Sequence, residues 1–319
     1  MKASKTTIFL FGLFVTMGYG LICRFAFVYA KTEVSFTFIF ILPIFLGAIP
    51  VLFIPKEELK SNKLYLFLSF VGICAFFAFC YLGGIEGLIC ILIISFPFWI
   101  FGLIGFLLFR LAKVLTKKSD VDKKYFPIFL FPLAFMGIET RIQTPAQEYT
   151  VSTSIEIHAD KQTVWDNTKN VKNIQPKEIE PHFIHWIGVP KPLNGELDKE
   201  GVGGVRHITW EKGIQFQEKI TSWGENTGFS YDILVDPKSI PDDTLDEHVK
   251  VGGRYFSVLK GSYHIDQLSD KRQKLTLTCT YKLTTNLNFY GKLWTDFFLE
   301  DFNETVLEII KKRSENPDR

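Results

Sequence analysis

The chain has 319 residues, a formal net charge of +2 and 15% aromatic residues. This near-neutral balance lacks the strongly basic field with which proteins attract nucleic-acid phosphates, so we expect no nucleic-acid partner. The average hides a sharp division, because residues 6–138 are mostly Phe, Leu, Ile and Gly whereas residues 139–319 have a mixed polar composition. The sequence therefore predicts one body in lipid and another in water.

Four apolar runs lie in the first half, at residues 8–29, 34–54, 64–82 and 88–111. Each is close to the roughly 20 residues with which a helix crosses about 30 Å of hydrocarbon. Residues 125–138 form a shorter run with two prolines, which suits either a short span or a re-entrant segment. We expect a membrane domain at residues 1–138 with five transmembrane helices, or four if the last run does not cross. The first run is too long for a secretory signal, so we expect it to be retained.

Lys and Arg gather at the N-terminus and in the loops after the second and fourth runs. They are Lys2, Lys5, Lys56, Lys60, Lys63, Arg110, Lys113, Lys117, Lys118, Lys123 and Lys124. Because positively charged short loops stay on the cytoplasmic side, the pattern predicts a cytoplasmic N-terminus. With five spans the soluble domain is extracytoplasmic, and with four it is cytoplasmic.

Two charged residues of the apolar half, Arg24 and Glu86, lie near the ends of predicted spans. A charge within a membrane span is a functional hypothesis by default. Near a helix end, however, a long side chain reaches the interface at little cost, and we expect both residues to do so. Cys279 is the one cysteine of the soluble half, which excludes a disulfide within that half.

Residues 139–150 are expected to form a linker, followed by a soluble domain at residues 151–313 and a tail at 314–319. Residues 151–159 alternate apolar and polar side chains as a strand does. Asp160 is the predicted N-cap of a short helix that ends near residue 169. Asn170 is expected to cap a second short turn, which Pro176 ends.

Five further strands are expected at residues 205–210, 214–223, 229–235, 254–268 and 274–283. Short turns between them predict an antiparallel meander. The chain then ends in a helix at about residues 289–313, whose apolar side chains recur every three or four positions. That stripe must be buried, and we expect the inner face of a curved sheet to cover it.

A strand, two short helices, a run of antiparallel strands and a long C-terminal helix resemble the START-like (SRPBCC) superfamily of helix-grip proteins. The superfamily includes polyketide cyclases/dehydrases, lipid-transfer domains and plant pollen-allergen-type binders. The resemblance covers residues 151–313 and is carried by VSTSIEIHADKQTVWDNTKNVKNI, GVGGVRHITWEKGIQFQEKITSW and LWTDFFLEDFNETVLEIIKKR. EGLICILI together with DEHVKVGGRYFSVLKGSY is similar to membrane-tethered bacterial members, which implies the bacterial inner (cytoplasmic) membrane.

The resemblance implies an α+β helix-grip domain, with an antiparallel sheet wrapped on the long helix, after an all-α transmembrane domain. It also implies a cavity between sheet and helix that accepts a hydrophobic small molecule or a lipid. A fold does not by itself fix a function, so the function must come from the site. We expect a membrane-anchored binding module, with the lipid bilayer and a hydrophobic ligand as its partners. The alternatives are an enzyme of the cyclase, dehydrase or hydrolase type, or a membrane sensor or scaffold subunit.

Glu218 stands in an otherwise apolar row with Ile214, Phe216 and Ile220 on the strand at 214–223. Three interpretations remain open: a buried charge pair, a polar hook for the ligand, and a general acid or base. Burial alone would raise its pKa, whereas a neighbouring Arg206 or Arg254 would lower it. Catalysis would also require a second positioned group, such as a Tyr or His.

The candidate cavity residues share a place on an inward-facing row or carry a group that could meet Glu218. The sequence does not decide which face of the strand at 205–210 points inward, so a polar residue from each face is included. The candidates are Glu218, Phe216, Ile214, Ile220, Arg206, His207, Tyr231, Tyr255, Tyr263, Tyr281, Trp294 and Phe298. No catalytic residue is named among them, and no cofactor is expected.

Two groups of possible metal ligands are interpreted as loops, so no metal is expected. Glu178, Glu180, His182 and His185 form EIEPHFIH, which has neither an HExxH helix nor a pair of cysteines. The acidic residues of the second group lack the spacing of a calcium loop; they are Asp242, Asp243, Asp246 and Glu247. The glycines of EGVGGVR indicate a turn, and Cys279 is expected to be a buried, inert thiol.

Overall fold

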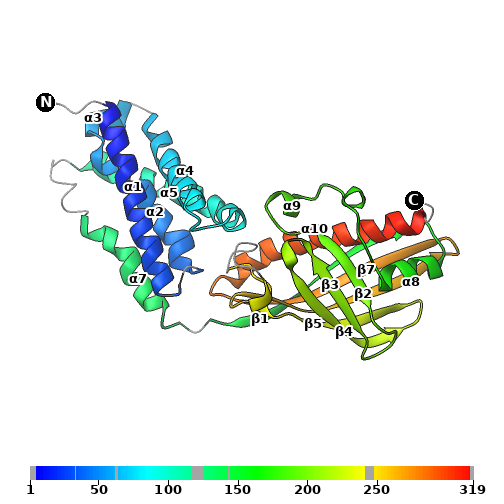
Figure 1. Ribbon diagram of the computed structural model, residues 1–319. Helices are drawn as coiled ribbons and strands as arrows, with labels where there is room; N and C mark the ends of the chain where they lie inside the picture. The colour runs from blue at the N-terminus through cyan, green and yellow to red at the C-terminus, as the bar shows by residue number, and fades with distance from the viewer. Residues whose placement is uncertain are drawn as a thin grey trace. The chain divides into compact units, whose positions relative to one another are not determined.

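The computed structural model describes residues 5–32, 34–61, 64–116, 126–142, 144–240 and 248–316. The chain divides into two compact units, a helical unit (Met1–Thr144) and a sheet unit (Pro145–Arg319). Figure 1 shows both units in chain colours. Several residues of the sequence predictions lie outside the described residues: Lys2, Lys63, Lys117, Lys118, Lys123, Lys124, Asp242, Asp243, Asp246 and Glu247.

The helical unit contains α1 (Lys5–Tyr29), the π-helix η1 (Thr37–Ile41) that continues into α2 (Leu42–Phe53), α3 (Lys56–Ser61), α4 (Leu64–Leu82), α5 (Leu88–Leu115), η2 (Phe126–Leu130) and α7 (Phe131–Glu139). Two helical segments, Thr7–Tyr29 and Leu88–Leu115, are long and apolar enough to cross a membrane. Buried core helices and signal sequences also meet that test. The other apolar helices, at Thr37–Phe53, Phe67–Leu82 and Pro127–Glu139, are shorter.

Helices α2 and α5 pack closely because glycines lie where their backbones meet. A Cβ atom added to Gly47 would lie 1.8 Å from the carbonyl oxygen of Gly102, and one added to Gly105 would lie 1.9 Å from that of Ile44. No larger side chain fits at either position without moving a helix. Small residues allow this kind of close helix approach.

The segment that ends in α7 is fastened to the rest of the helical unit. The hydroxyl of Tyr19 on α1 donates to the carbonyl of Phe129 at 2.7 Å. The carboxylate of Glu139 accepts the N–H groups of Phe36 and Thr37, at 2.7 and 3.1 Å, where the η1–α2 helix begins. Those N–H groups have no partner within a helix, and a carboxylate suits the positive end of the helix dipole.

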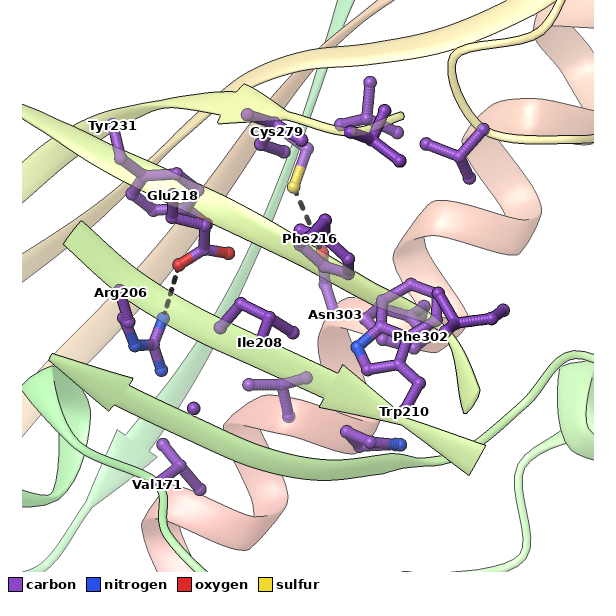
Figure 2. A pocket seen from close by; sticks show the side chains of 18 of the residues that line it. Val171, Arg206, Ile208, Trp210, Phe216, Glu218, Tyr231, Cys279, Phe302 and Asn303 are labelled. Atoms are coloured by element: carbon purple, nitrogen blue, oxygen red, sulfur yellow. Dashed lines mark hydrogen bonds and ion pairs between the residues drawn. The ribbon is translucent and has the colours of Figure 1, made fainter. Parts of the chain in front are cut away.

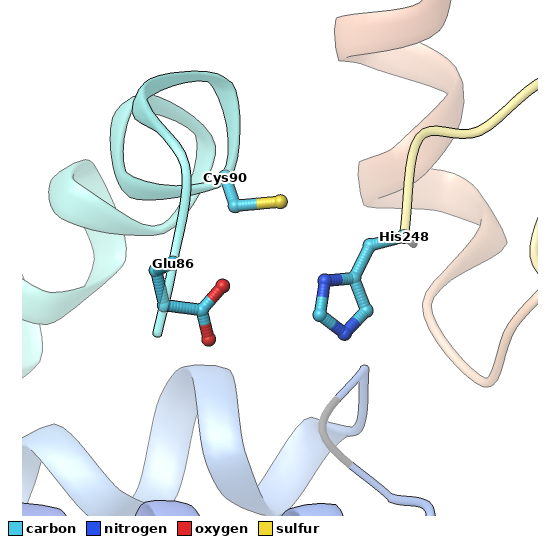
Figure 3. Close-up of side chains that lie close together, drawn as sticks. All are labelled: Glu86, Cys90 and His248. Carbon is cyan, nitrogen blue, oxygen red and sulfur yellow. The ribbon is translucent and has the colours of Figure 1, made fainter. Parts of the chain in front are cut away.

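The sequence predicted that Arg24 and Glu86 would each reach the membrane interface. The structure pairs them with each other instead. Both are buried, and Arg24 Nε donates to Glu86 Oε1. Because each side chain supplies the opposite charge that the other needs, the two can lie together inside the unit. Figure 3 shows Glu86 just before α5 and Cys90 in its first turn; His248, also drawn there, belongs to the sheet unit.

The sheet unit is built on a seven-stranded antiparallel sheet of order β1-β7-β6-β5-β4-β3-β2. The strands are β1 (Ala146–Ile157), β2 (Pro192–Leu197), β3 (Val205–Trp210), β4 (Gln215–Gly224), β5 (Gly228–Leu234), β6 (Phe256–Ser269) and β7 (Arg272–Thr284). The long α10 (Asn288–Glu315) runs across the sheet (Figure 1). Its buried Leu307, Ile309 and Ile310 share one core with Leu275 and Leu277 of β7. This arrangement confirms the predicted helix-grip architecture.

The beginning of the sheet unit differs from the prediction in two places. β1 starts at Ala146, inside the expected linker, because its first residues pair with the end of β7, with Ala146 opposite Thr284. The edge strand β2 was not predicted, since PLNGEL contains a proline and a glycine. An edge position tolerates both residues because one side of the strand needs no ladder partner.

The short helices also differ in part from the prediction. α8 (Lys161–Lys169) begins as expected, with the side chain of Asp160 accepting from the N–H of Thr163 at 2.9 Å. No helix follows directly at Asn170, whose side chain instead accepts from the N–H of Leu197 on β2. The next helical turns are the 3-10 helix η3 (Pro176–Glu178) and α9 (Phe183–Trp186). Pairing of the adjacent Val171 with Gly195 of β2 explains why the helix is displaced.

Candidate ligand-binding site

A cavity of about 110 Å³ lies between the inner face of the sheet and α10. It is smaller than the roughly 300–1,000 Å³ of pockets for drug-sized ligands and close to the roughly 150 Å³ of an engineered apolar cavity that binds benzene. The lining side chains come from β2 to β7, from α10, and from the segments before β2 and before β6. They include Ile174, Pro192, Ile208, Trp210, Ile214, Phe216, Ile233, Val235, Ile240, Val251, Val258, Leu277, Leu299, Phe302 and Val306.

Strand alternation decides which side chains of β3 reach the cavity. Arg206, Ile208 and Trp210 line it (Figure 2), whereas His207 between them is exposed on the opposite face. Ile208 lies directly opposite Phe216 of β4, which also faces inward. Of the two faces of β3 between which the sequence could not decide, the inward one is therefore the face that carries Arg206.

Arg206 and Glu218 form an ion pair in the cavity wall. They are directly opposite residues of β3 and β4, and Arg206 Nη1 donates to Glu218 Oε2 at 2.9 Å (Figure 2). Their side chains are nearly inaccessible, with residue exposures of 3% and 6%. The guanidinium also lies over the rings of Phe229 and Tyr263, at 6.0 and 5.6 Å from their centroids. Glu218 is therefore a paired carboxylate.

Glycine at position 195 of β2 leaves space for this guanidinium. A Cβ atom added to Gly195 would lie 3.0 Å from Arg206 Nη2. A larger residue there would require the guanidinium to shift by a few tenths of an ångström. The edge strand that the sequence did not predict is thus part of the site.

Burial and pairing act in opposite directions on these two charges. Burial raises the pKa of the Glu218 carboxyl, and the positive charge of Arg206 opposes that rise. For Arg206, burial disfavours the charge, but the Glu218 carboxylate together with Tyr263 and Tyr231 outweighs burial, and the guanidinium pKa is raised. Arg206 Nε is buried and makes no hydrogen bond, so one donor of this pair remains unused.

The other titratable groups of the cavity are unsuited to acid–base or nucleophilic work near neutral pH. Burial raises the pKa of Tyr263 and of Cys279 to about 12, and that of Tyr231 well above its ordinary value. The Cys279 thiol donates to Asn303 Oδ1 at 3.4 Å. Among the described residues, Arg206 is the one hydrogen-bond partner of the Glu218 carboxylate. No Tyr or His of the described chain is therefore placed to share a proton with it.

Six of the twelve candidate residues line the cavity: Glu218, Phe216, Ile214, Arg206, Tyr231 and Tyr263. The other six lie elsewhere: Ile220, His207, Tyr255, Tyr281, Trp294 and Phe298. Ile220 has the inward orientation of its row but packs in the main core beyond the cavity. Tyr281 donates its hydroxyl to Asp296 of α10.

Tyr255 precedes β6, and its ring lies 5.6 Å from that of His248. Trp294 and Phe298 contact each other on the first half of α10, with their ring centroids 5.6 Å apart. In that half the predicted burial of the apolar stripe is wrong, because Leu293 and Phe297 are 66% and 44% exposed. The cavity begins further along the helix, at Leu299.

The cavity residues that the sequence did not indicate include several from α10 and from the segment before β6. Phe302 and Val306 were expected to be buried, but sequence periodicity does not show which strand a helical residue meets. In the structure Phe302 packs against Trp210, with ring centroids 4.6 Å apart and the ring planes tilted by 41°. For Val235, Ile240 and Val251, the sequence shows only that they are apolar, which does not indicate a place in the cavity wall.

No protein-family model matches the chain, and no curated protein matches it. Among solved structures, the Zhui aromatase/cyclase from Streptomyces sp. R1128 aligns with a TM-score of 0.36 and 14% identity, over 54% of this chain and 97% of that one. Norcoclaurine synthase from Thalictrum flavum aligns with a TM-score of 0.32 and 11% identity, over 53% of this chain and 97% of that one. Ara h 8.0201 aligns with a TM-score of 0.33 and 13% identity, over 53% and 98%.

Likenesses this distant carry no weight for function. The strand order and the helix across the sheet define the sheet unit as a helix-grip unit, and the cavity between them is its candidate site.

Proposed function

We propose that this protein is a membrane-anchored binding module that holds a hydrophobic small molecule, or the apolar part of a lipid, in the helix-grip cavity. The observation that carries the proposal is an apolar cavity enclosed by the sheet and α10, with a single buried ion pair in its wall. Apolar pockets with a few polar groups bind ligands by burying apolar surface and by fixing orientation with those groups.

The ion pair restricts the chemistry of the ligand. Arg206 and Glu218 neutralise each other, so a charged ligand group would gain no net countercharge from them. Arg206 Nε has an unused N–H, which favours a ligand that carries one hydrogen-bond acceptor, such as a carbonyl or hydroxyl oxygen. The volume suits a single ring or a segment of an acyl chain.

The membrane anchor is supported by the surface of the helical unit. Its helices expose many large apolar side chains, among them Leu10, Phe11, Phe14, Ile22, Phe25, Phe67, Phe70, Phe79, Leu82, Phe96, Leu103, Leu107, Leu108 and Leu111. So many exposed large apolar side chains are costly in water and suit hydrocarbon. Five spans, a cytoplasmic N-terminus and an extracytoplasmic sheet unit are parts of this proposal. A reporter fused to the C-terminus and active on one side of the membrane tests the orientation.

An exposed apolar patch on the sheet unit supports lipid as the source of the ligand. The patch consists of Phe183 and Trp186 of α9 and Phe289, Leu293 and Phe297 of α10. The rings of Phe183 and Phe297 lie 5.7 Å apart, so α9 and α10 both contribute to it. Phe289 lies near the point where the chain enters the unit, because the adjacent Asn288 donates its Nδ2–H to the carbonyl of Pro145 at 2.8 Å. Exposed aromatic side chains are suited to the interface of a bilayer.

The test is native mass spectrometry of the full chain, purified in detergent and released intact into the gas phase. The proposal predicts a co-purified adduct, or binding of at least one member of a panel of fatty acids, isoprenoids and small aromatic ketones. A full chain that carries no adduct and binds no member of the panel would contradict it.

A further inference from the structure

A second polar site lies on the side of α10 that faces the segment before β2. His182 of that segment is buried between two carboxylates of α10. Its Nδ1 lies 3.0 Å from Asp301 Oδ1, and its Nε2 lies 3.2 Å from Glu308 Oε2. Asp301 is 119 residues further along the chain, so no local sequence motif could have indicated this arrangement.

Glu304, one helical turn after Asp301, completes a set of three possible ligands. One ligand atom each from His182, Asp301 and Glu304 lie within 4.8 Å of one another. We propose that these three residues bind a divalent transition-metal ion such as Zn²⁺. One imidazole and two carboxylates are donors that Zn²⁺ accepts, and a fourth tetrahedral position is left for water or another ligand. The imidazole disfavours Ca²⁺ and Mg²⁺, which prefer oxygen donors alone.

The neighbouring groups orient these ligands as outer partners do at metal sites. Glu308 can accept the Nε2–H of His182, which leaves the Nδ1 lone pair directed to the side of Asp301. The second oxygen of Asp301 accepts the N–H of Ile184 at 2.8 Å and so fixes the carboxylate. A histidine held by a carboxylate on one nitrogen and presenting the other is the usual arrangement at protein zinc sites.

The charge of the cluster favours a cation. Three carboxylates face one imidazole, so two negative charges remain even when His182 is protonated. Glu304 makes no hydrogen bond or ion pair with any residue that the structure describes. The nearby Lys312 is already bonded to Glu180 and to the carbonyl of Glu178. A divalent ion would therefore neutralise an otherwise uncompensated group.

The second histidine of the EIEPHFIH segment is not part of this site. His185 Nδ1 lies 2.9 Å from the carbonyl oxygen of Val189, and its Nε2 lies 3.4 Å from Thr305 Oγ1. The sequence predicted no metal because the segment alone lacks a zinc-binding motif. The carboxylates of α10 change that interpretation.

An ion at this site would fasten the segment between Ile174 and Pro192 to α10. Both of these residues line the ligand cavity, so the ion would stabilise one wall of it. The metal site does not depend on the proposed ligand function, because none of its three ligands lines the cavity.

Competition against a chromophoric zinc chelator tests the site, with the full chain in detergent, free of affinity tags and stripped of metal beforehand. We expect one Zn²⁺ per chain in the wild type. Glu304→Gln and His182→Gln should each weaken binding by at least about 10–100-fold, the loss typical of outer partners of a metal. Co²⁺ should give the visible absorption of a tetrahedral site.

Glu300→Gln is the matched control, since Glu300 is an exposed glutamate one turn before Glu304 on α10 with no partner in the described chain. It should bind Zn²⁺ as the wild type does. Because Glu304 holds no structural contact, loss of folding does not confuse its comparison with Glu300. Absence of stoichiometric Zn²⁺ binding in the wild type, or equal affinities of the Glu304→Gln and Glu300→Gln variants, would overturn the proposal.

Discussion

Arg206 Nη1 and Glu218 Oε2 lie 2.9 Å apart on directly opposite residues of β3 and β4, in the wall of an apolar cavity. The carboxylate that interrupts the apolar row of β4 is thus ion-paired. Moving two charges out of water is costly, and their mutual attraction offsets that cost while both are present. The pair thus keeps two polar groups in the cavity wall without leaving a net charge there.

Removal of one member of this pair should be far more harmful than removal of both. Arg206→Met leaves Glu218 buried without a countercharge and should lower the free energy of unfolding by about 3–5 kcal/mol. The double variant Arg206→Met/Glu218→Leu should recover most of that loss, because an apolar pair suits the surrounding wall. Denaturant unfolding of the full chain in detergent, followed by tryptophan fluorescence, measures both. A double variant as unstable as Arg206→Met would show that the charges matter for another reason.

The ion pair between Glu178 and Arg313 should make stability depend on acid. Arg313 Nε and Nη2 donate to the two Glu178 oxygens at 2.6 and 3.0 Å and hold the pKa of that carboxyl below its ordinary 4.5. A carboxyl with a lowered folded pKa contributes stability above its unfolded pKa and loses it as pH falls through the folded pKa. Glu178→Gln should therefore cost about 1 kcal/mol near neutral pH and less below pH 4.5.

Thermal unfolding between pH 7 and pH 3 measures this difference, with Glu300→Gln as an exposed, unpaired control. The control should match the wild type across the range. If Glu178→Gln lost the same stability at pH 3 as at pH 7, the ion pair would not be the cause.

Asp160 should stabilise α8 as its N-cap. Its carboxylate accepts from both the N–H and the hydroxyl of Thr163, at 2.9 and 2.7 Å, which lowers its pKa. Asp160→Ala should lower the free energy of unfolding by about 1 kcal/mol, whereas Asp160→Asn should cost much less, since Asn is also a strong N-cap. Chemical unfolding of the two variants side by side tests this. Equal losses would mean that the carboxylate charge, rather than capping, is what matters.

Much of the architecture follows from local sequence patterns. The strands β3 to β7 and helix α10 lie within two residues of the predicted bounds, because alternation and helical periodicity follow burial. The exposure of Leu293 and Phe297 on the first half of α10 was not predicted. β2 escaped prediction because its pairing with β3 outweighs the poor strand propensity of proline and glycine. The early start of β1 has the same cause, namely pairing with β7.

The site was less predictable than the fold. Glu218 could be singled out as a carboxylate in an apolar row, but whether Arg206 or Arg254 lay beside it depended on strand register. His207 was a candidate because a strand's inward face cannot be fixed from six residues. The approach of His182 to Asp301 and Glu304 depends on how α10 lies against a distant loop, which no local pattern records.

The central claim is that the cavity holds a ligand, and a matched pair of adjacent substitutions tests it most directly. Ile208→Trp fills the cavity from β3, whereas His207→Trp places the same indole one residue away on the exposed face. Val306→Phe fills the cavity from α10 and serves as a second variant if Ile208→Trp does not fold. In native mass spectrometry of the full chain, we predict that the ligand adduct is kept in His207→Trp and lost in Ile208→Trp and Val306→Phe. Equal adduct in all three folded variants would contradict a ligand site between the sheet and α10.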